Sequence, residues 1–129
     1  MEFDNDRSID IYFPPVTLDG KLACLRMNFT TFGHFAVKLK YVHERRYKER
    51  MLFRSLESLG EEPRLWETSI TSDMTENQEF VVVLHAQSSS LGTMAVINSI
   101  NLQMDECYKT GKDYVSNFTF RILSIFRCK

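Results

Sequence analysis

The chain has 129 residues, of which 43% are hydrophobic and 26% are charged. This is the length of one domain and the composition of a folded protein, not of a disordered one. Sixteen basic residues nearly balance seventeen acidic ones, so no overall field attracts nucleic acid or an anionic membrane. Ten Phe and five Tyr against five Gly and three Pro favour a sheet-rich protein with an aromatic core.

The start of the chain bears on its location. The first ten residues are polar and acidic, which is not the pattern of a secretory signal peptide. No apolar run approaches the roughly 20 residues that a membrane-spanning helix needs, so we expect no membrane insertion by this segment. The protein is therefore either cytosolic or a piece of a longer secreted chain.

Two-residue alternation predicts strands in the first half of the chain. Segment 22–30 places Leu25, Met27 and Phe29 on one face and Cys24, Arg26 and Asn28 on the other. Segment 35–42 alternates in the same way, with Lys38 and Lys40 opposite an apolar face. Such alternation is the pattern of a half-buried strand.

The charged stretch 43–60 fits two structures. Met51, Leu52, Leu56 and Leu59 have moderately good helical spacing. A charged turn followed by a strand near 51–55 fits the surrounding pattern better, and it is the structure that we predict.

The second half also predicts strands. Segment 80–86 is continuously apolar and β-branched, which is typical of a strand buried on both faces. Segment 94–102 alternates, with Asn98 as a polar interruption, and segment 118–126 alternates again. Polar turns separate about seven such strands, which predicts an all-β protein, an antiparallel and jelly-roll-like β-sandwich. The predicted core consists of Leu25, Met27, Phe29, Val37, Leu39, Trp66, Val81, Val83, Val96 and Ile100.

Residues suited to catalysis are scattered. His34, His43 and His85 have no metal-ligand spacing, and we interpret His85 as a satisfied core or rim histidine. The serines at 88–90 lack the framing glycines of a nucleophile elbow. The basic cluster at 45–48 is flanked by acidic residues and is interpreted as a solvated turn. We expect no enzymatic activity, no cofactor and no metal.

Three cysteines, Cys24, Cys107 and Cys128, leave the redox compartment open. An odd count favours reduced thiols in the cytosol. Against this, Asn28 and Asn117 each begin an N-glycosylation sequon. Asn28 lies on the polar face of its predicted strand, where a glycan would point outward.

An ordered series of motifs runs through residues 9–107: YFPPV, CLRMNFTTFG from Cys24 to Gly33, FAVKLKYV, Leu52-Phe53, Trp66, FVVVLHA, Gly92, MAVINSINL and Cys107. This series resembles the MAM domain, an extracellular jelly-roll sandwich of cell-surface receptors, adhesion molecules and membrane metalloproteases. The N-terminal portion of that family has no counterpart before Ile9. Its acidic pair is replaced here by Asn98 and Ser99, so the resemblance supplies no cation site.

The resemblance implies an N-terminally incomplete MAM-like sandwich over 1–107 and a tail over 108–129 that is available to replace a missing strand. It also implies a disulfide between Cys24 and Cys107, with Cys128 unpaired or engaged with another segment. The implied function is extracellular or cell-surface binding of a protein, including a second copy of the chain, as part of a longer protein. The alternatives are an intracellular scaffold with reduced cysteines and an accessory domain of a membrane protease.

Overall fold

The computed structural model describes residues 2–3, 8–18, 22–55, 64–87, 93–107, 116–120 and 124–128. The elements are β1 (Glu2–Phe3), β2 (Ser8–Tyr12), β3 (Ala23–Phe32), β4 (His34–His43), β5 (Arg46–Ser55), β6 (Arg64–Ile70), the 3-10 helix η1 (Ser72–Thr75), β7 (Phe80–Gln87), β8 (Thr93–Gln103), β9 (Ser116–Phe120) and β10 (Ser124–Cys128). None of the described segments forms a helix with the length and apolarity to cross a membrane.

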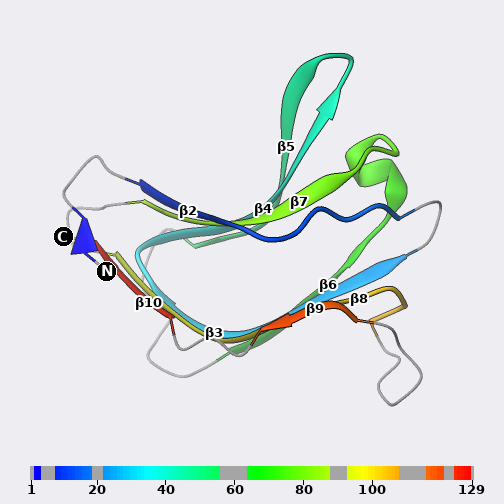
Figure 1. Cartoon of the computed structure of the whole chain (residues 1–129). Coiled ribbons are helices and arrows are strands. Elements are labelled where there is room, and N and C mark those ends of the chain that lie inside the picture. Colours follow the sequence, from blue (N-terminus) through cyan, green and yellow to red (C-terminus); the bar gives the residue numbers. More distant parts are fainter. Residues whose placement is uncertain are drawn as a thin grey trace.

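The strands form two sheets that face one another (Figure 1). A six-stranded sheet has the order β1-β10-β8-β3-β6, with β9 also paired to β8, and a four-stranded sheet has the order β2-β7-β4-β5. The short β1–β10 pair is parallel, and the other pairs among the described strands are antiparallel. The predicted all-β antiparallel sandwich is confirmed, whereas jelly-roll connectivity stays a prediction.

Gly33 carries the chain from one sheet to the other. It is the single residue between β3, in the six-stranded sheet, and β4, in the four-stranded sheet. Its φ is 84°, a conformation that is accessible to glycine without a steric penalty. The sharp reversal brings the aromatic ends of the two strands together, with the ring centroids of Phe29 and Phe35 5.9 Å apart.

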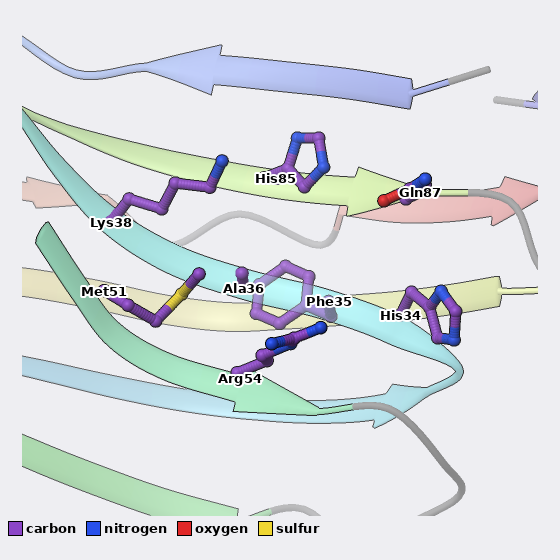
Figure 2. Close-up of a pocket in the computed structure, with 8 residues that line it drawn as sticks. All are labelled: His34, Phe35, Ala36, Lys38, Met51, Arg54, His85 and Gln87. Carbon is purple, nitrogen blue, oxygen red and sulfur yellow. The ribbon is translucent and has the colours of Figure 1, made fainter. Parts of the chain in front are cut away.

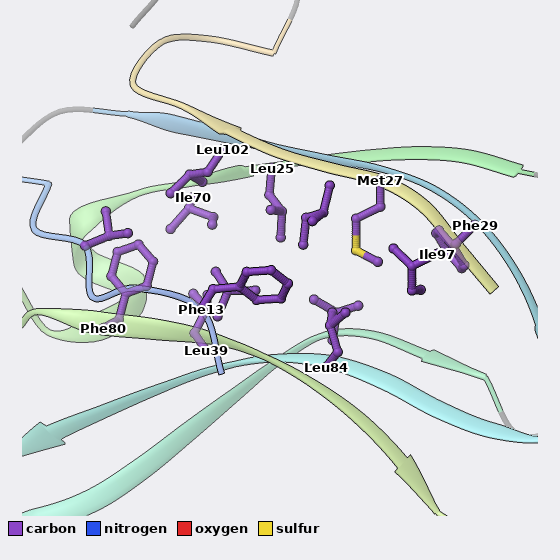
Figure 3. Close-up of a cluster of buried hydrophobic side chains, with 14 of the residues drawn as sticks. Phe13, Leu25, Met27, Phe29, Leu39, Ile70, Phe80, Leu84, Ile97 and Leu102 are labelled. Carbon is purple, nitrogen blue, oxygen red and sulfur yellow. The ribbon is translucent and has the colours of Figure 1, made fainter. Parts of the chain in front are cut away.

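The core fills the space between the sheets (Figure 3). Phe29 lies at one end of it and makes an edge-on contact with Phe53 at 5.2 Å between ring centroids. Edge-to-face aromatic pairs of this kind contribute beyond their buried area. Six predicted core residues belong to the buried cluster: Leu25, Met27, Phe29, Val37, Leu39 and Ile100. Trp66 is half-buried and packs against the margin of the cluster.

Three predicted core positions were wrong. In β7, Phe80, Val82, Leu84 and Ala86 face the core, so Val81 and Val83 lie on the opposite face. A run that is apolar throughout carries no parity signal, and this is why the face was misassigned. Val83 is nevertheless buried.

The third error, Val96, comes from a β-bulge. Asn28 pairs with Ser99 and Phe29 pairs with Ile97, so Asn98 has no partner in the register of β3. A bulge inserts one residue and reverses the parity of the strand beyond it. Ile97 therefore faces the core in place of Val96. The polar interruption at Asn98 marks the irregularity.

The charged stretch after His43 is a hairpin followed by a strand, as predicted. Glu44 and Arg45 both have positive φ, 52° and 64°, which is the conformation of a tight type I′ hairpin turn. The strand is longer than expected, because β5 begins at Arg46.

The segment 108–129 contributes two strands to the six-stranded sheet. Both β9 and β10 pair with β8. The side chains of this segment lie outside the described residues, so the alternation predicted for 118–126 is untested.

Candidate functional site

The outer face of the four-stranded sheet gathers nitrogen-bearing side chains around one small residue. Alternation along β4 turns His34, Ala36 and Lys38 outward while the residues between them face the core. In the register of the sheet, Ala36 lies opposite Arg54 of β5 on one side and opposite His85 of β7 on the other. Directly opposite residues have Cβ atoms about 5 Å apart, and residues two apart on a strand share a face. Arg54, His85, His34 and Lys38 therefore surround the methyl group of Ala36.

This arrangement produces a depression, called here the Ala36 pocket, with a volume of about 270 Å³. Figure 2 shows His85 and Gln87 from β7, Met51 and Arg54 from β5, and the residues of β4 between them. The lining consists of His34, Phe35, Ala36, Lys38, Met51, Arg54, His85 and Gln87. None of these eight residues is acidic, and none is a Ser, Thr or Cys that could act as a nucleophile.

Glu49 lies beside the pocket and partly neutralises its lysine. Its carboxylate is 3.3 Å from Lys38 Nζ and 3.4 Å from Lys40 Nζ. Burial works to raise the pKa of Glu49, but the hydrogen bonds and charges of the two lysines outweigh burial and hold the pKa below its ordinary value of 4.5. One carboxylate thus contacts two ammonium groups, so the three residues together keep a net positive charge.

Lys40 is also held by Tyr12 of β2. Its Nζ donates a hydrogen bond to Tyr12 Oη at 3.2 Å and lies 5.2 Å from the centroid of the ring. Burial works to lower the pKa of Lys40, but the contacts with Tyr12 and Glu49 raise it above its ordinary value of 10.5. The ammonium group is therefore charged and fixed over the sheet.

His85 is oriented by Asp10. Its Nδ1 is 2.5 Å from Asp10 Oδ1, and since a carboxylate is an acceptor, Nδ1–H is the donor. This leaves Nε2 as the ring nitrogen that Asp10 does not hold. His85 is half-buried and hydrogen-bonded, in agreement with its interpretation as a satisfied rim histidine. None of the described lining residues is a nucleophile that this pair could activate.

The second exposed feature is the outer end of the β4–β5 hairpin, called here the hairpin arm, from Val42 to Lys48. It projects beyond the two layers of the sandwich (Figure 1). Val42 and Tyr47 are cross-strand partners, and their side chains are 44% and 91% exposed. Lys48 Nζ is 2.8 Å from Glu76 Oε2, and this contact ties the base of the arm to the residue that follows η1.

Cys24 and Cys107 are joined by a disulfide, with their Cα atoms 4.8 Å apart. This separation is within the usual range for a bridge. The bond links the start of β3 to the segment just after β8. Arg26 reinforces the same region, because its Nε is 2.8 Å from Glu67 Oε2 and its Nη2 donates to the Cys107 carbonyl.

The same region holds the one group of potential metal ligands found among the described residues. One ligand atom each from Cys24, Glu67 and Cys107 lie within 4.8 Å of one another. Metal ligation by cysteine requires a thiolate, and the two sulfurs are bonded to each other here. The trio can therefore offer ligands only after the bridge is reduced.

The predicted glycosylation sites are placed as follows. Asn28 is half-buried on the outer face of the six-stranded sheet, on the opposite parity to Met27 and Phe29. Its Oδ1 accepts a hydrogen bond from Asn98 Nδ2 at 3.3 Å. The side chain of Asn117 lies outside the described residues.

Comparison of the chain with protein-family models, curated proteins and solved structures finds no significant match. The site therefore has to be interpreted from its own residues.

The pocket could not be predicted from the sequence, because the residues that line it are far apart in the chain. His34, His85 and Arg54 come from three strands, and only the register of β4 with β5 and β7 brings them together. The available signal was the small residue Ala36 in an outward position between two cationic or titratable residues.

Proposed function

We propose that the chain is a non-catalytic recognition module that binds a protein partner through the hairpin arm. The observation that carries the proposal is the exposure of Tyr47, 91%, at the end of a hairpin that projects beyond the sandwich (Figure 1). Burial of such a large exposed aromatic side chain against a partner contributes strongly to the free energy of binding. Tyrosine is also enriched among the residues that dominate interface energies.

The charge of the arm favours an acidic partner surface. Between Val42 and Lys48 the chain has three cationic residues, Arg45, Arg46 and Lys48, and one acidic residue, Glu44. Glu76 neutralises Lys48, so the arm keeps an excess of one positive charge. Complementary charge accelerates association and selects among partners. The apolar pair of Val42 and Tyr47 would supply the buried contact with the partner, and the surrounding positive charge would orient the partner as it approaches.

The edge of the sheet offers a second mode of contact. β5 is the last strand of the order β2-β7-β4-β5, so its outer backbone groups are not paired within that sheet. An extended segment of a partner can add to such an edge by main-chain hydrogen bonds.

We propose an extracellular or cell-surface location, as part of a longer protein. The Cys24–Cys107 bridge supports it, because disulfides persist mainly in oxidising compartments. The sequons at Asn28 and Asn117 and the resemblance to the MAM domain support it further. The same resemblance makes a second copy of the chain one of the partners to be tested.

Site-specific photo-crosslinking tests the proposal. A photoreactive phenylalanine analogue is placed at position 47 on the arm or, as a control, at Leu65, which is 74% exposed on β6 of the other sheet. Both proteins are applied to intact cells, and the crosslinked products are identified by mass spectrometry. We expect a discrete protein adduct at 47 and none at 65. An adduct containing only this chain identifies the second copy as the partner.

Competition completes the experiment. Excess unlabelled native chain should suppress the adduct, and the double variant Val42→Ser/Tyr47→Ser should not. Equal labelling at 47 and 65, or equal competition by the double variant, would show that the arm is not the binding surface.

A further inference from the structure

We infer that the Ala36 pocket binds a tetrahedral oxyanion, the phosphate or sulfate group of a small molecule or of a monoester. This inference does not depend on the hairpin arm, which lies at the other end of the β4–β5 hairpin. It starts from the floor of the pocket, where Ala36 is the one small side chain on the outer face between the larger residues His34 and Lys38.

The charge of the lining favours an anion. Among the residues that the structure describes, the lining has two side chains with fixed positive charge, Lys38 and Arg54, two imidazoles and no carboxylate. Among the described residues, Arg54 has no carboxylate within ion-pair distance. A guanidinium without a carboxylate partner retains its N–H donors for an external oxyanion.

The residues that carry the donors lie on different sides of Ala36, and this favours a tetrahedral anion over a carboxylate. Arg54 and His85 flank Ala36 from opposite neighbouring strands, and His34 and Lys38 flank it from the two directions along β4 (Figure 2). A carboxylate accepts hydrogen bonds from two oxygens in one plane and is best matched by a single fork. A phosphate or sulfate has three or four oxygens that point in different directions, so it can accept from several sides together.

The histidine opposite Arg54 is already oriented for this role. Asp10 accepts a hydrogen bond from Nδ1 of His85, which fixes the ring and leaves Nε2 unengaged by Asp10. Lys38 shares its ammonium with Glu49 at 3.3 Å, and its three N–H groups are enough for both the carboxylate and a ligand. Glu49 thus competes with the ligand for Lys38 and lowers the affinity of the pocket.

The volume limits the size of the group. About 270 Å³ is slightly below the range of pockets that enclose drug-sized molecules, about 300–1,000 Å³. It accommodates one oxyanion with the first atoms of its carrier. The carrier itself would extend from the pocket into solvent.

Titration calorimetry of the whole chain tests the inference. The probes are inorganic phosphate, sulfate, O-phosphoserine and glucose 6-sulfate, with acetate as the planar anion, all at constant ionic strength because salt screens such contacts. We expect saturable binding of phosphate or sulfate with one site per chain and weaker binding of acetate. A monoester that binds more tightly than the free ion identifies the carrier, and equal affinities identify the free ion as the ligand.

Four variants locate the site. Arg54→Ala should weaken binding about tenfold or more, the usual cost of a lost charge-assisted hydrogen bond. Ala36→Leu should abolish binding by filling the floor while it keeps every charge. Glu49→Gln should strengthen binding by freeing Lys38. Arg50→Ala, on the same strand but outside the lining, should change the affinity less than about twofold, as expected for a screened surface charge.

Circular dichroism of each variant checks that it is folded. The inference fails if neither phosphate nor sulfate binds saturably, or if acetate binds equally well. It also fails if folded Ala36→Leu keeps the native affinity, or if Arg50→Ala loses as much as Arg54→Ala, because binding would then follow overall charge.

Discussion

Removing the Cys24–Cys107 bridge should destabilise the fold strongly. The two cysteines are 83 residues apart in the sequence. In the chain-entropy model, a bridge that closes a loop of this size stabilises the folded state by about 4–5 kcal/mol at 25 °C. Domains of this kind are stable by roughly 5–15 kcal/mol in total, so the bridge supplies a large fraction of the stability.

The structure indicates that most of this effect belongs to the unfolded state. Cys24 already pairs with Gln103 in the register of β3 and β8, and Arg26 binds the carbonyl of Cys107. The two ends are therefore held together in the folded state with or without the covalent bond. The double variant Cys24→Ala/Cys107→Ala should keep its circular dichroism spectrum and lose stability.

Thermal and urea unfolding measure the loss. For a chain of this length, about 4–5 kcal/mol corresponds to a decrease in Tm of roughly 15 °C. With an m-value of about 2 kcal/mol/M, the urea midpoint should fall by about 2 M. Cys128→Ala is the matched control, because Cys128 lies outside the bridge, and it should leave both midpoints nearly unchanged.

Thiol titration provides the decisive result. The native protein should react with alkylating agent at Cys128 alone, and the reduced, unfolded protein should react at all three cysteines. Reaction of both Cys24 and Cys107 in the native protein would refute the bridge. An unchanged urea midpoint in the double variant would refute the energetic reasoning, and a reduced pair would also remove the main structural support for an extracellular location.

Three further predictions concern stability. Gly33→Ala should lower Tm by about 4–8 °C, because alanine at a φ of 84° costs about 1–2 kcal/mol; an unchanged Tm would mean that the turn adopts another conformation. Thr31 has a buried hydroxyl with no partner among the described residues, so urea unfolding of Thr31→Val should show an equal or higher stability, and a loss above about 1 kcal/mol would contradict this. The stabilisation from Glu49, whose pKa is lowered by Lys38 and Lys40, is complete above pH 4.5 and is lost as the pH falls through the lowered pKa. Glu49→Gln should therefore lose less stability than the native chain between about pH 5 and pH 3, and parallel pH profiles would exclude this contribution.

The sequence was sufficient for strands whose two faces differ in polarity. In β3 and β4, alternation identified the core faces correctly at Leu25, Met27, Val37 and Leu39. The continuous apolar run of β7 identified a central strand, which lies between β2 and β4, but it could not assign a face to Val83. Alternation in the sequence shows which side chains face the core only where the two faces of a strand differ in polarity.

The site was predictable only in its parts. Lys38 was recognisable as an outward residue and His85 as a core or rim residue, but their convergence with His34 and Arg54 depends on which strands are neighbours. Strand order and register arise from long-range pairing, and a single sequence carries no local signal for them. The disulfide was anticipated only through the resemblance to a family in which the same two points are bridged.

A β-bulge in β5 explains why the pocket could not be worked out from alternation. Val37 pairs with Phe53 and Lys38 pairs with Met51, so Leu52 is the extra residue. In a regular strand, Met51 and Arg54 would point to opposite faces, whereas the bulge turns both of them outward.

The charge register near the turn does not depend on this bulge. The two-residue turn at Glu44 and Arg45 pairs His43 with Arg46 and sets Glu49 opposite Lys40. Glu49 stabilises both Lys38 and Lys40 from that position. The bulge lies beyond the Lys38–Met51 pair and shifts the register only there. Without the bulge, Phe53 would lie opposite Ala36, so it is the bulge that places Arg54 beside Ala36. The proposed oxyanion site therefore depends on this one-residue insertion.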